Sequence, residues 1–224
     1  MRLIGVLLVI AGCGNPDVPI TPDGHPLPDG PPRVGGLTVT WNADPALPGE
    51  VDDKITVTEA TFQIEYLQVE SDLGLAERTT RSKFQLRWTS GVAPEPDTFR
   101  EAPAATYQSV LIGIRPAPGQ PAYEIKGNWQ DDEAGSGAGA GGMMRPFRIT
   151  DNMSMIMIQI ACQKTLPADG SLTIPVKVNL KDAFDNLDFK NVPPVGGVLV
   201  VDGGPALAAV RSQIAKLFDL ENDN

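Results

Sequence analysis

The chain has 224 residues, with 28 acidic and 18 basic side chains, a formal net charge of -10 and an isoelectric point near 4.5. This acidity argues against nucleic-acid binding and against electrostatic docking on anionic lipid, because both need clusters of Lys and Arg. The length and the 42% hydrophobic content suffice for one large β domain or two small ones.

Residues 1–12 have the features of a secretory signal peptide. Arg2 supplies a positive start, residues 3–10 are apolar apart from Gly5, and Ala11 and Gly12 form a small-residue end. The apolar run is much shorter than the ~20 residues that cross a bilayer as a helix, so a transmembrane anchor is not expected.

Residues 10–13, Ile-Ala-Gly-Cys, resemble the lipobox of bacterial lipoproteins. In that family the cysteine sulfur receives a diacylglycerol, the signal is cleaved before the cysteine, and the new amino group is acylated. The resemblance implies that Cys13 is lipidated and that fatty acyl chains such as palmitate anchor the protein, since several chains together anchor stably. The Gly at 14, where an Asp commonly marks inner-membrane retention, implies the outer membrane of a two-membrane bacterium. The alternative is an ordinary signal peptide with an incidental cysteine.

Residues 13–36 are expected to be the lipidated cysteine and a Pro/Gly-rich tether, with prolines at 16, 19, 22, 26, 28, 31 and 32. Proline removes a backbone donor and fixes φ, so this stretch should form a semi-extended spacer that lifts the domain at 37–224 off the membrane. The single histidine, His25, lies in this tether.

From residue 37 onward, apolar and polar residues alternate, as is typical of strands with one buried face and one solvated face. We expect strands at residues 37–41, 55–70, 84–88, 106–114, 122–129, 146–150, 154–161, 172–180 and 197–201. Because proline cannot donate to a β-ladder, Pro175 places its strand at a sheet edge or at a bulge.

The segment at 55–70 changes its apolar face twice. Apolar residues occupy odd positions up to 57, even positions from 60 to 66, and odd positions again from 67. A strand needs an irregularity to do this, so we expect bulges near Glu59 and near Leu67, with the strand crossing between sheets.

One helix is expected at about 205–218, because Gly204-Pro205 suits a helix start and apolar residues follow at helical spacing to Leu217 and Phe218. The fold class is therefore mainly β: an antiparallel two-sheet sandwich of about eight strands with one C-terminal amphipathic helix. With the segments GGLTVTW, FQIEYLQVESDLG and YQSVLIGI, the chain resembles uncharacterised bacterial lipoproteins that carry a single β-sandwich domain. That group implies a fold and a location, but no reaction.

The folded region offers little for catalysis. It contains no histidine, so Ser-His-Asp, Cys-His and Cys/His zinc sites cannot be built there. Cys162 follows the apolar run 156–161 and is expected to be a buried small hydrophobe. The loop at 131–142 contains G-x-G-x-x-G but leads into a strand, so we interpret it as a flexible loop and not as a dinucleotide site.

Paired carboxylates leave glycoside cleavage open, with Glu59, Glu65, Glu70 and Asp72 as the acidic residues available. Acidic residues at alternating strand positions usually form solvated faces, and we favour that interpretation.

Met153, Met155 and Met157 would share one face of a strand, with Met143 and Met144 upstream. Such thioethers could bind Cu(I), which prefers soft sulfur ligands. Methionine is also common core filler, so we interpret this face as core and assign no metal or cofactor.

Trp88 and Trp129 lie at strand ends and could stack on sugar rings. An aromatic residue at a strand end is more often a lid on the sandwich core, which is the interpretation we favour.

The sequence thus favours an exported, non-enzymatic, lipid-anchored envelope module with a structural, adhesive or ligand-binding role. Its partners would be the membrane and a protein or glycan of the envelope, not nucleic acid. The two alternatives are a periplasmic copper-handling protein that uses the methionine face and a glycan-binding domain.

Overall fold

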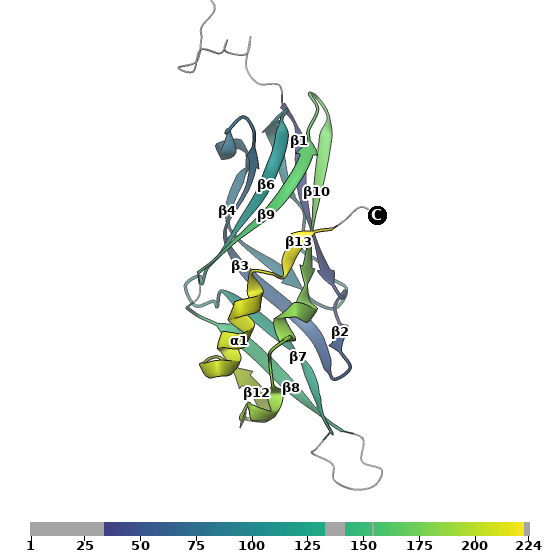
Figure 1. The fold of residues 1–224 in the computed structure, drawn as a ribbon, viewed down its shortest axis with the longest axis vertical. Coiled ribbons are helices and arrows are strands. Elements are labelled where there is room, and N and C mark those ends of the chain that lie inside the picture. The colour runs from purple at the N-terminus through teal and green to yellow at the C-terminus, as the bar shows by residue number, and fades with distance from the viewer. Residues whose placement is uncertain (1–33, 133–141, 154, 222–224) are drawn as a thin grey trace, which may run out of the picture. The chain divides into compact units, whose positions relative to one another are not determined.

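The computed structural model describes residues 34–132, 142–153 and 155–221. The expected signal peptide, Cys13, the tether up to residue 33 and the centre of the Gly-rich loop (133–141) lie outside these residues. Two packed β-sheets and one α-helix near the C-terminus build the described part (Figure 1). The predicted two-sheet sandwich is confirmed, with thirteen strands in the described part instead of about eight.

The smaller sheet has four strands in the order β13-β10-β1-β5. Their bounds are β1 Val34–Asp44, β5 Asp97–Pro103, β10 Ser171–Asn179 and β13 Phe218–Leu220. β1 and β10 run parallel, whereas β5 and β13 are antiparallel to their neighbours, so the sheet is mixed and not purely antiparallel. Because β1 begins at Val34, residues 34–36 belong to the sheet and not to the tether.

The larger sheet has nine strands, seven of them in the order β11-β12-β8-β7-β3-β6-β9, while β2 and β4 also pair with β3. Their bounds are β2 Gly49–Asp52, β3 Ile55–Ser71, β4 Thr80–Trp88, β6 Thr106–Ile114, β7 Tyr123–Asp131, β8 Met143–Asp151, β9 Ile156–Thr165, β11 Pro194–Val195 and β12 Val198–Val201. β12 and β8 form a second parallel pair. In the described part of the chain, short 3-10 helices lie at Ala76–Thr79 (η1), Leu180–Phe184 (η3) and Phe189–Asn191 (η4).

The long strand β3 contains both predicted irregularities. Its register against β7 shifts between Val57 and Glu59, and its register against β6 shifts between Ile64 and Tyr66, which is close to the expected position at Leu67. Each bulge restores the apolar residues to the core side, so buried side chains follow the whole strand. The predicted crossing between sheets is wrong, because every partner of β3 belongs to the larger sheet. Its first half pairs with β7 and its second half with β6.

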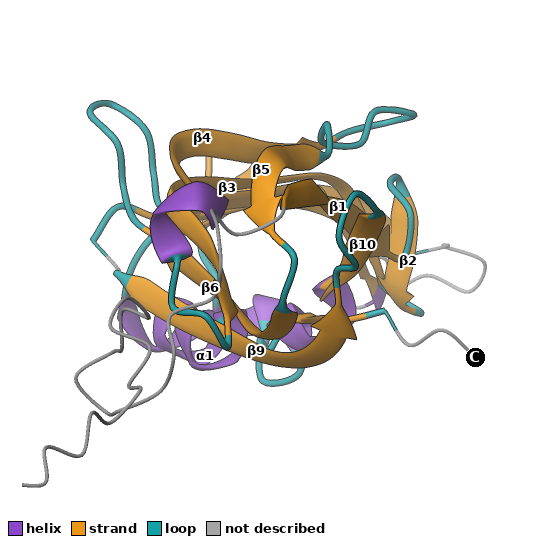
Figure 2. Ribbon diagram, turned by 90° about the horizontal axis from the view of Figure 1, so that it is seen from above, coloured by secondary structure: helices purple, strands orange, loops and turns teal. Residues whose placement is uncertain are grey.

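The core fills the space between the two sheets, and Figure 2 shows their strands arranged around this shared interior. Phe62 of β3 and Phe218 of β13 join the sheets directly, with ring centroids 5.2 Å apart in an edge-on arrangement. Pro175 lies where β10 has little neighbouring strand, since β13 pairs only with Val176–Val178. The Pro175 carbonyl accepts from Glu221 N at 3.0 Å, so its ring nitrogen also faces away from β1 and no bond to β1 is lost.

The helix α1 spans Gly204–Ile214, with Pro205 in its first turn and Leu207, Val210 and Ile214 buried. The prediction that it continues to 218 is wrong. After Ile214 the chain turns, with Leu217 N donating to Ile214 O at 3.3 Å, and Phe218–Leu220 then pair with β10 as β13. Leu217 and Phe218 are buried in the structure, and they would also be buried on the apolar face of a longer helix. Their apolar character therefore does not distinguish a helix from a strand.

Candidate functional site

The two tryptophans proposed as ligand contacts are both part of the core. Trp88 is 3% exposed and Trp129 is 8% exposed. Trp88 meets Phe62 edge-on at 6.1 Å, and Trp129 lies 5.8 Å from Phe189 of η4, measured between ring centroids. These contacts fit lids on the sandwich core, and neither indole offers a broad open face for stacking on a sugar.

Trp129 also lines a cavity of about 710 Å³ where β7 ends and β8 begins. Arg145 of β8, which is opposite Trp129, forms an ion pair with Asp131 at the end of β7, with Nη2 and Oδ2 3.0 Å apart. The Arg145 Nε atom is buried and has no hydrogen-bond partner in the described residues. Asp131 and Arg145 in this cavity are thus already paired, and its aromatic residues Trp129 and Phe189 are buried in the core.

The methionines do not fill the core, and that interpretation is wrong. Met153, Met155 and Met157 are 86%, 61% and 67% exposed, while Ile158 and Ile160 of β9 face the interior. Met153 and Met155 precede β9, and on the outer face of β9 the residues Met157, Gln159 and Ala161 are all exposed. A strand between two layers would have been apolar on both faces, and β9 is not such a strand.

The upstream methionines do not join this group. Met143 and Met144 begin β8, and Met153 follows the end of that strand. The eight residue steps from Met143 to Asp151 span about 26 Å in an extended strand. Only Met153, Met155 and Met157 therefore remain as neighbouring thioethers.

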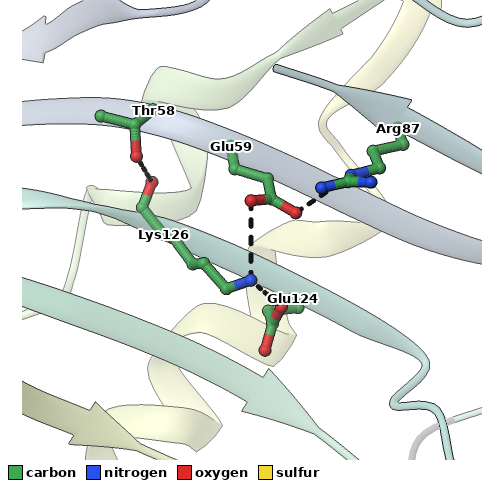
Figure 3. A network of polar contacts seen from close by, with 5 residues as sticks. All are labelled: Thr58, Glu59, Arg87, Glu124 and Lys126. Carbon is green, nitrogen blue, oxygen red and sulfur yellow. Dashed lines mark hydrogen bonds and ion pairs between the residues drawn. The ribbon is translucent and has the colours of Figure 1, made fainter. Parts of the chain in front are cut away.

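Glu59 of β3 takes part in a network of ion pairs on the sheet surface. Glu59 accepts from Arg87 Nε at 3.1 Å and lies 3.6 Å from Lys126 Nζ, which also pairs with Glu124 at 2.5 Å (Figure 3). Figure 3 shows this network running across β4, β3 and β7, with Thr58 donating to the Lys126 carbonyl.

Further along the same face, Glu70 accepts from Ser109 Oγ at 2.7 Å, and Asp72 accepts from Thr106 N at 3.2 Å. These contacts support the interpretation of a solvated, charged sheet face rather than a pair of catalytic carboxylates.

Two other carboxylates are deeply buried, and both fasten elements together. Asp97 of β5 accepts from Trp41 Nε1 at 2.8 Å and is ion-paired with Arg81 of β4, so it connects the two sheets. Asp151 at the end of β8 accepts from Arg211 of α1 at 2.6 Å. The part of the chain that the structure describes holds no group of three or more His, Cys, Asp or Glu side chains suited to a metal ion.

A second large cavity, of about 610 Å³, was not anticipated from the sequence. It lies where β3 changes partner from β7 to β6, between Lys83 of β4 and the loop at 115–120. Both ends of that loop are fixed to the backbone of Gln63: Arg115 N donates to Gln63 O at 3.1 Å, and Gln63 N donates to Ala122 O at 2.8 Å. The only sequence signal for it was the broken alternation in 55–70, which marks the bulge at Glu65.

No helix among the described residues is long and apolar enough to cross a membrane. Comparison with known proteins finds no matching family, curated protein or solved structure.

Proposed function

We propose that the protein is a non-enzymatic, lipid-anchored module of the cell envelope that presents its β-sandwich for binding. The observation that carries the proposal is the segment Ile-Ala-Gly-Cys at 10–13, which follows a short apolar run and precedes a proline-rich stretch. The sandwich begins at Val34, so twenty residues (14–33) separate Cys13 from the first strand. A spacer of this length and composition suits a domain held off a membrane surface.

The arrangement of titratable groups supports a role without catalysis. The deeply buried carboxylates Asp97 and Asp151 are engaged with Arg81 and Arg211. Glu59 is shared between Arg87 and Lys126. Such pairs stabilise the fold and the surface, whereas an acid or base catalyst needs a proton that it can release to a substrate.

Anchoring is tested by growing bacteria that express the full-length chain with a clickable palmitate analogue. The native chain should incorporate the label and fractionate with outer membranes, and Cys13→Ser should do neither. Cys162→Ser is the matched control, because it removes the other cysteine and should leave labelling unchanged. A native chain that stays unlabelled, or that keeps residues 1–12, contradicts the proposal.

A second candidate function is Cu(I) binding, and the exposure of Met153, Met155 and Met157 is the observation that favours it. Met157 is the second residue of β9 and Met155 immediately precedes that strand, so their Cα atoms are at most about 7 Å apart. Flexible thioether side chains can converge on one soft ion over that distance.

The copper hypothesis predicts that Cu(I), supplied under reducing conditions, raises the melting temperature of the native protein. Met155→Leu with Met157→Leu should abolish the shift. Met143→Leu with Met144→Leu should not, because those residues lie at the far end of β8. No shift with the native protein would remove this candidate.

A further inference from the structure

The cavity between β3, β4 and the loop at 115–120 is lined by the largely buried polar side chain of Gln63. Gln63 is 7% exposed, and it lies on the outer face of β3 because its neighbours Phe62 and Ile64 face the core. Within the described residues its side-chain amide makes no hydrogen bond, and its polar atoms keep contact with solvent. The amide is therefore available to hydrogen-bond a molecule that enters the cavity.

The walls of this cavity are rigid. Ala117, Pro118, Gly119 and Gln120 form a tight turn, in which Gln120 N donates to Ala117 O at 2.9 Å and Gly119 has a φ of 74°. Proline followed by glycine at positive φ is the pattern of a type II turn. Because a preformed wall loses little entropy on binding, this loop suits a small ligand.

The opposite wall carries backbone strain at a charged residue. Lys83 has a φ of 58° inside β4, a conformation that side chains other than glycine rarely adopt. It lies at the level of Glu65, where β3 has its second bulge. Strained residues persist where the surrounding structure holds them, often at binding sites.

The lining of the cavity carries more positive than negative side chains, although the protein as a whole is acidic. Lys83 and Arg115 line it and are both exposed, and neither has an ion-pair partner in the described part of the chain. Glu65 is the one acidic residue in its lining.

We propose that this cavity binds a small polyhydroxylated carboxylate, of the class of the uronic acids. Lys83 and Arg115 bind the carboxylate through charge-assisted hydrogen bonds. The Gln63 amide and the Glu65 carboxylate bind hydroxyl groups, because they offer both donors and acceptors. The volume of about 610 Å³ lies in the range of small-molecule sites. This inference names a ligand class for the binding role proposed above, and it does not depend on the lipid anchor.

The test is calorimetric titration of the full-length protein with glucuronate and, as a neutral counterpart, glucose. Glucuronate should bind at millimolar concentrations or below, more weakly as salt is raised, and glucose at least about tenfold more weakly. Arg115→Gln and Lys83→Gly should each weaken glucuronate binding about tenfold or more. Lys181→Gln, which removes an exposed cation on η3 that does not line the cavity, should leave it unchanged.

Lys83→Gly also separates binding from folding. Glycine accepts the positive φ at this position, so the melting temperature should stay the same or rise while glucuronate binding falls. Equal affinity for glucose and glucuronate, absent binding of glucuronate, or equal losses in Lys83→Gly and Lys181→Gln would each overturn the inference. Palmitate labelling of Cys13 is independent of these outcomes, so a failure here is distinguishable from a failure of the anchoring proposal.

Discussion

Arg211 of α1 holds the fully buried carboxylate of Asp151 in a two-pronged ion pair, with Nε 2.6 Å from Oδ2 and Nη2 2.9 Å from Oδ1. The same Oδ1 accepts from the backbone N–H of Met153 at 2.9 Å. The pair joins the helix to the end of β8, and its two members differ in burial, since the Arg211 side chain is 41% exposed.

This difference predicts an asymmetric response to mutation. Arg211→Met removes the main counter-charge of a buried carboxylate and should cost about 2–4 kcal/mol of unfolding free energy. Asp151→Asn should cost less, because water can solvate the exposed guanidinium while the amide keeps part of the hydrogen bonding. Urea denaturation at neutral pH measures both values. An Asp151→Asn variant less stable than Arg211→Met would contradict the expectation.

Two glycines allow close packing and should differ in their tolerance of a side chain. A Cβ on Gly127 would overlap the Thr56 carbonyl oxygen and approach the Phe147 ring, whereas a Cβ on Gly113 would overlap the ring of Tyr66. A half-buried tyrosine can move aside more easily than backbone, so Gly127→Ala should destabilise more than Gly113→Ala, at roughly 3 against 1–2 kcal/mol.

The Gly113 effect has an internal control. Tyr66→Ser removes the ring, so Gly113→Ala should be nearly neutral in that background. Thermal unfolding of the four proteins completes the cycle, and additive effects would show that the Tyr66 ring is not what Gly113 accommodates.

The buried tyrosines predict a loss of stability at high pH. Burial, and then the charge of Asp72, raises the pKa of Tyr107 to about 12 from its usual 10.0. Burial and the neighbouring Asp151 raise the pKa of Tyr123 as well. Since the folded-state pKa values lie above the unfolded ones, the stabilisation is complete below pH 10 and is lost as the pH rises toward 12. Tyr107 alone should account for about 2 kcal/mol of this loss.

Tyr107→Phe is the matched control for the alkaline effect. It removes the titrating group and also the hydrogen bond from Tyr107 Oη to Pro103 O, 2.9 Å long. The variant should therefore be about 1 kcal/mol less stable at pH 7 but should lose less stability between pH 10 and 12. Urea titrations at pH 7, 10 and 11 measure the slope, and an unchanged slope would contradict the assignment to Tyr107.

The thiol of Cys162 should be unreactive toward thiol reagents in the folded protein. It is 3% exposed, its thiol donates to the Tyr107 carbonyl at 3.5 Å, and burial raises its pKa. A Cys13→Ser chain, which keeps only this thiol, should not react with a thiol reagent such as DTNB until it is unfolded in urea. Rapid labelling without denaturant would show that β9 is more open than the structure indicates.

Much of the fold follows from local pattern. Period-two alternation locates β3, β4, β6, β7, β9, β10 and β12 within a few residues, because each has one buried and one solvated face. The broken alternation in β3 also indicates both bulges, at Thr58 and Glu65, since a strand cannot otherwise change its apolar face. The apolar run at 156–161 likewise indicates that Cys162 is buried, as it is in the structure.

Strands with weak or mixed patterns are found only in the structure. β13 has only three residues, and Phe218 also fits the last turn of α1. The pairing of β5 with β1 and of β13 with β10 depends on backbone groups that no local signal reveals. Parallel pairing of β1 with β10 joins residues more than 130 positions apart, and local alternation carries no information on the direction of a partner strand.

The sequence by itself determined the strand-rich class, the irregularities of β3 and the lipobox-like start, because each depends on neighbouring residues. Tertiary structure alone decided that the outer face of β9, with Met157, is solvated, and that Met153 and Met155 before this strand are exposed as well. It also placed Gln63, Lys83 and Arg115 around one cavity, although no sequence motif links them. Burial and proximity depend on which elements pack together, and that is a property of the whole sandwich rather than of any one strand.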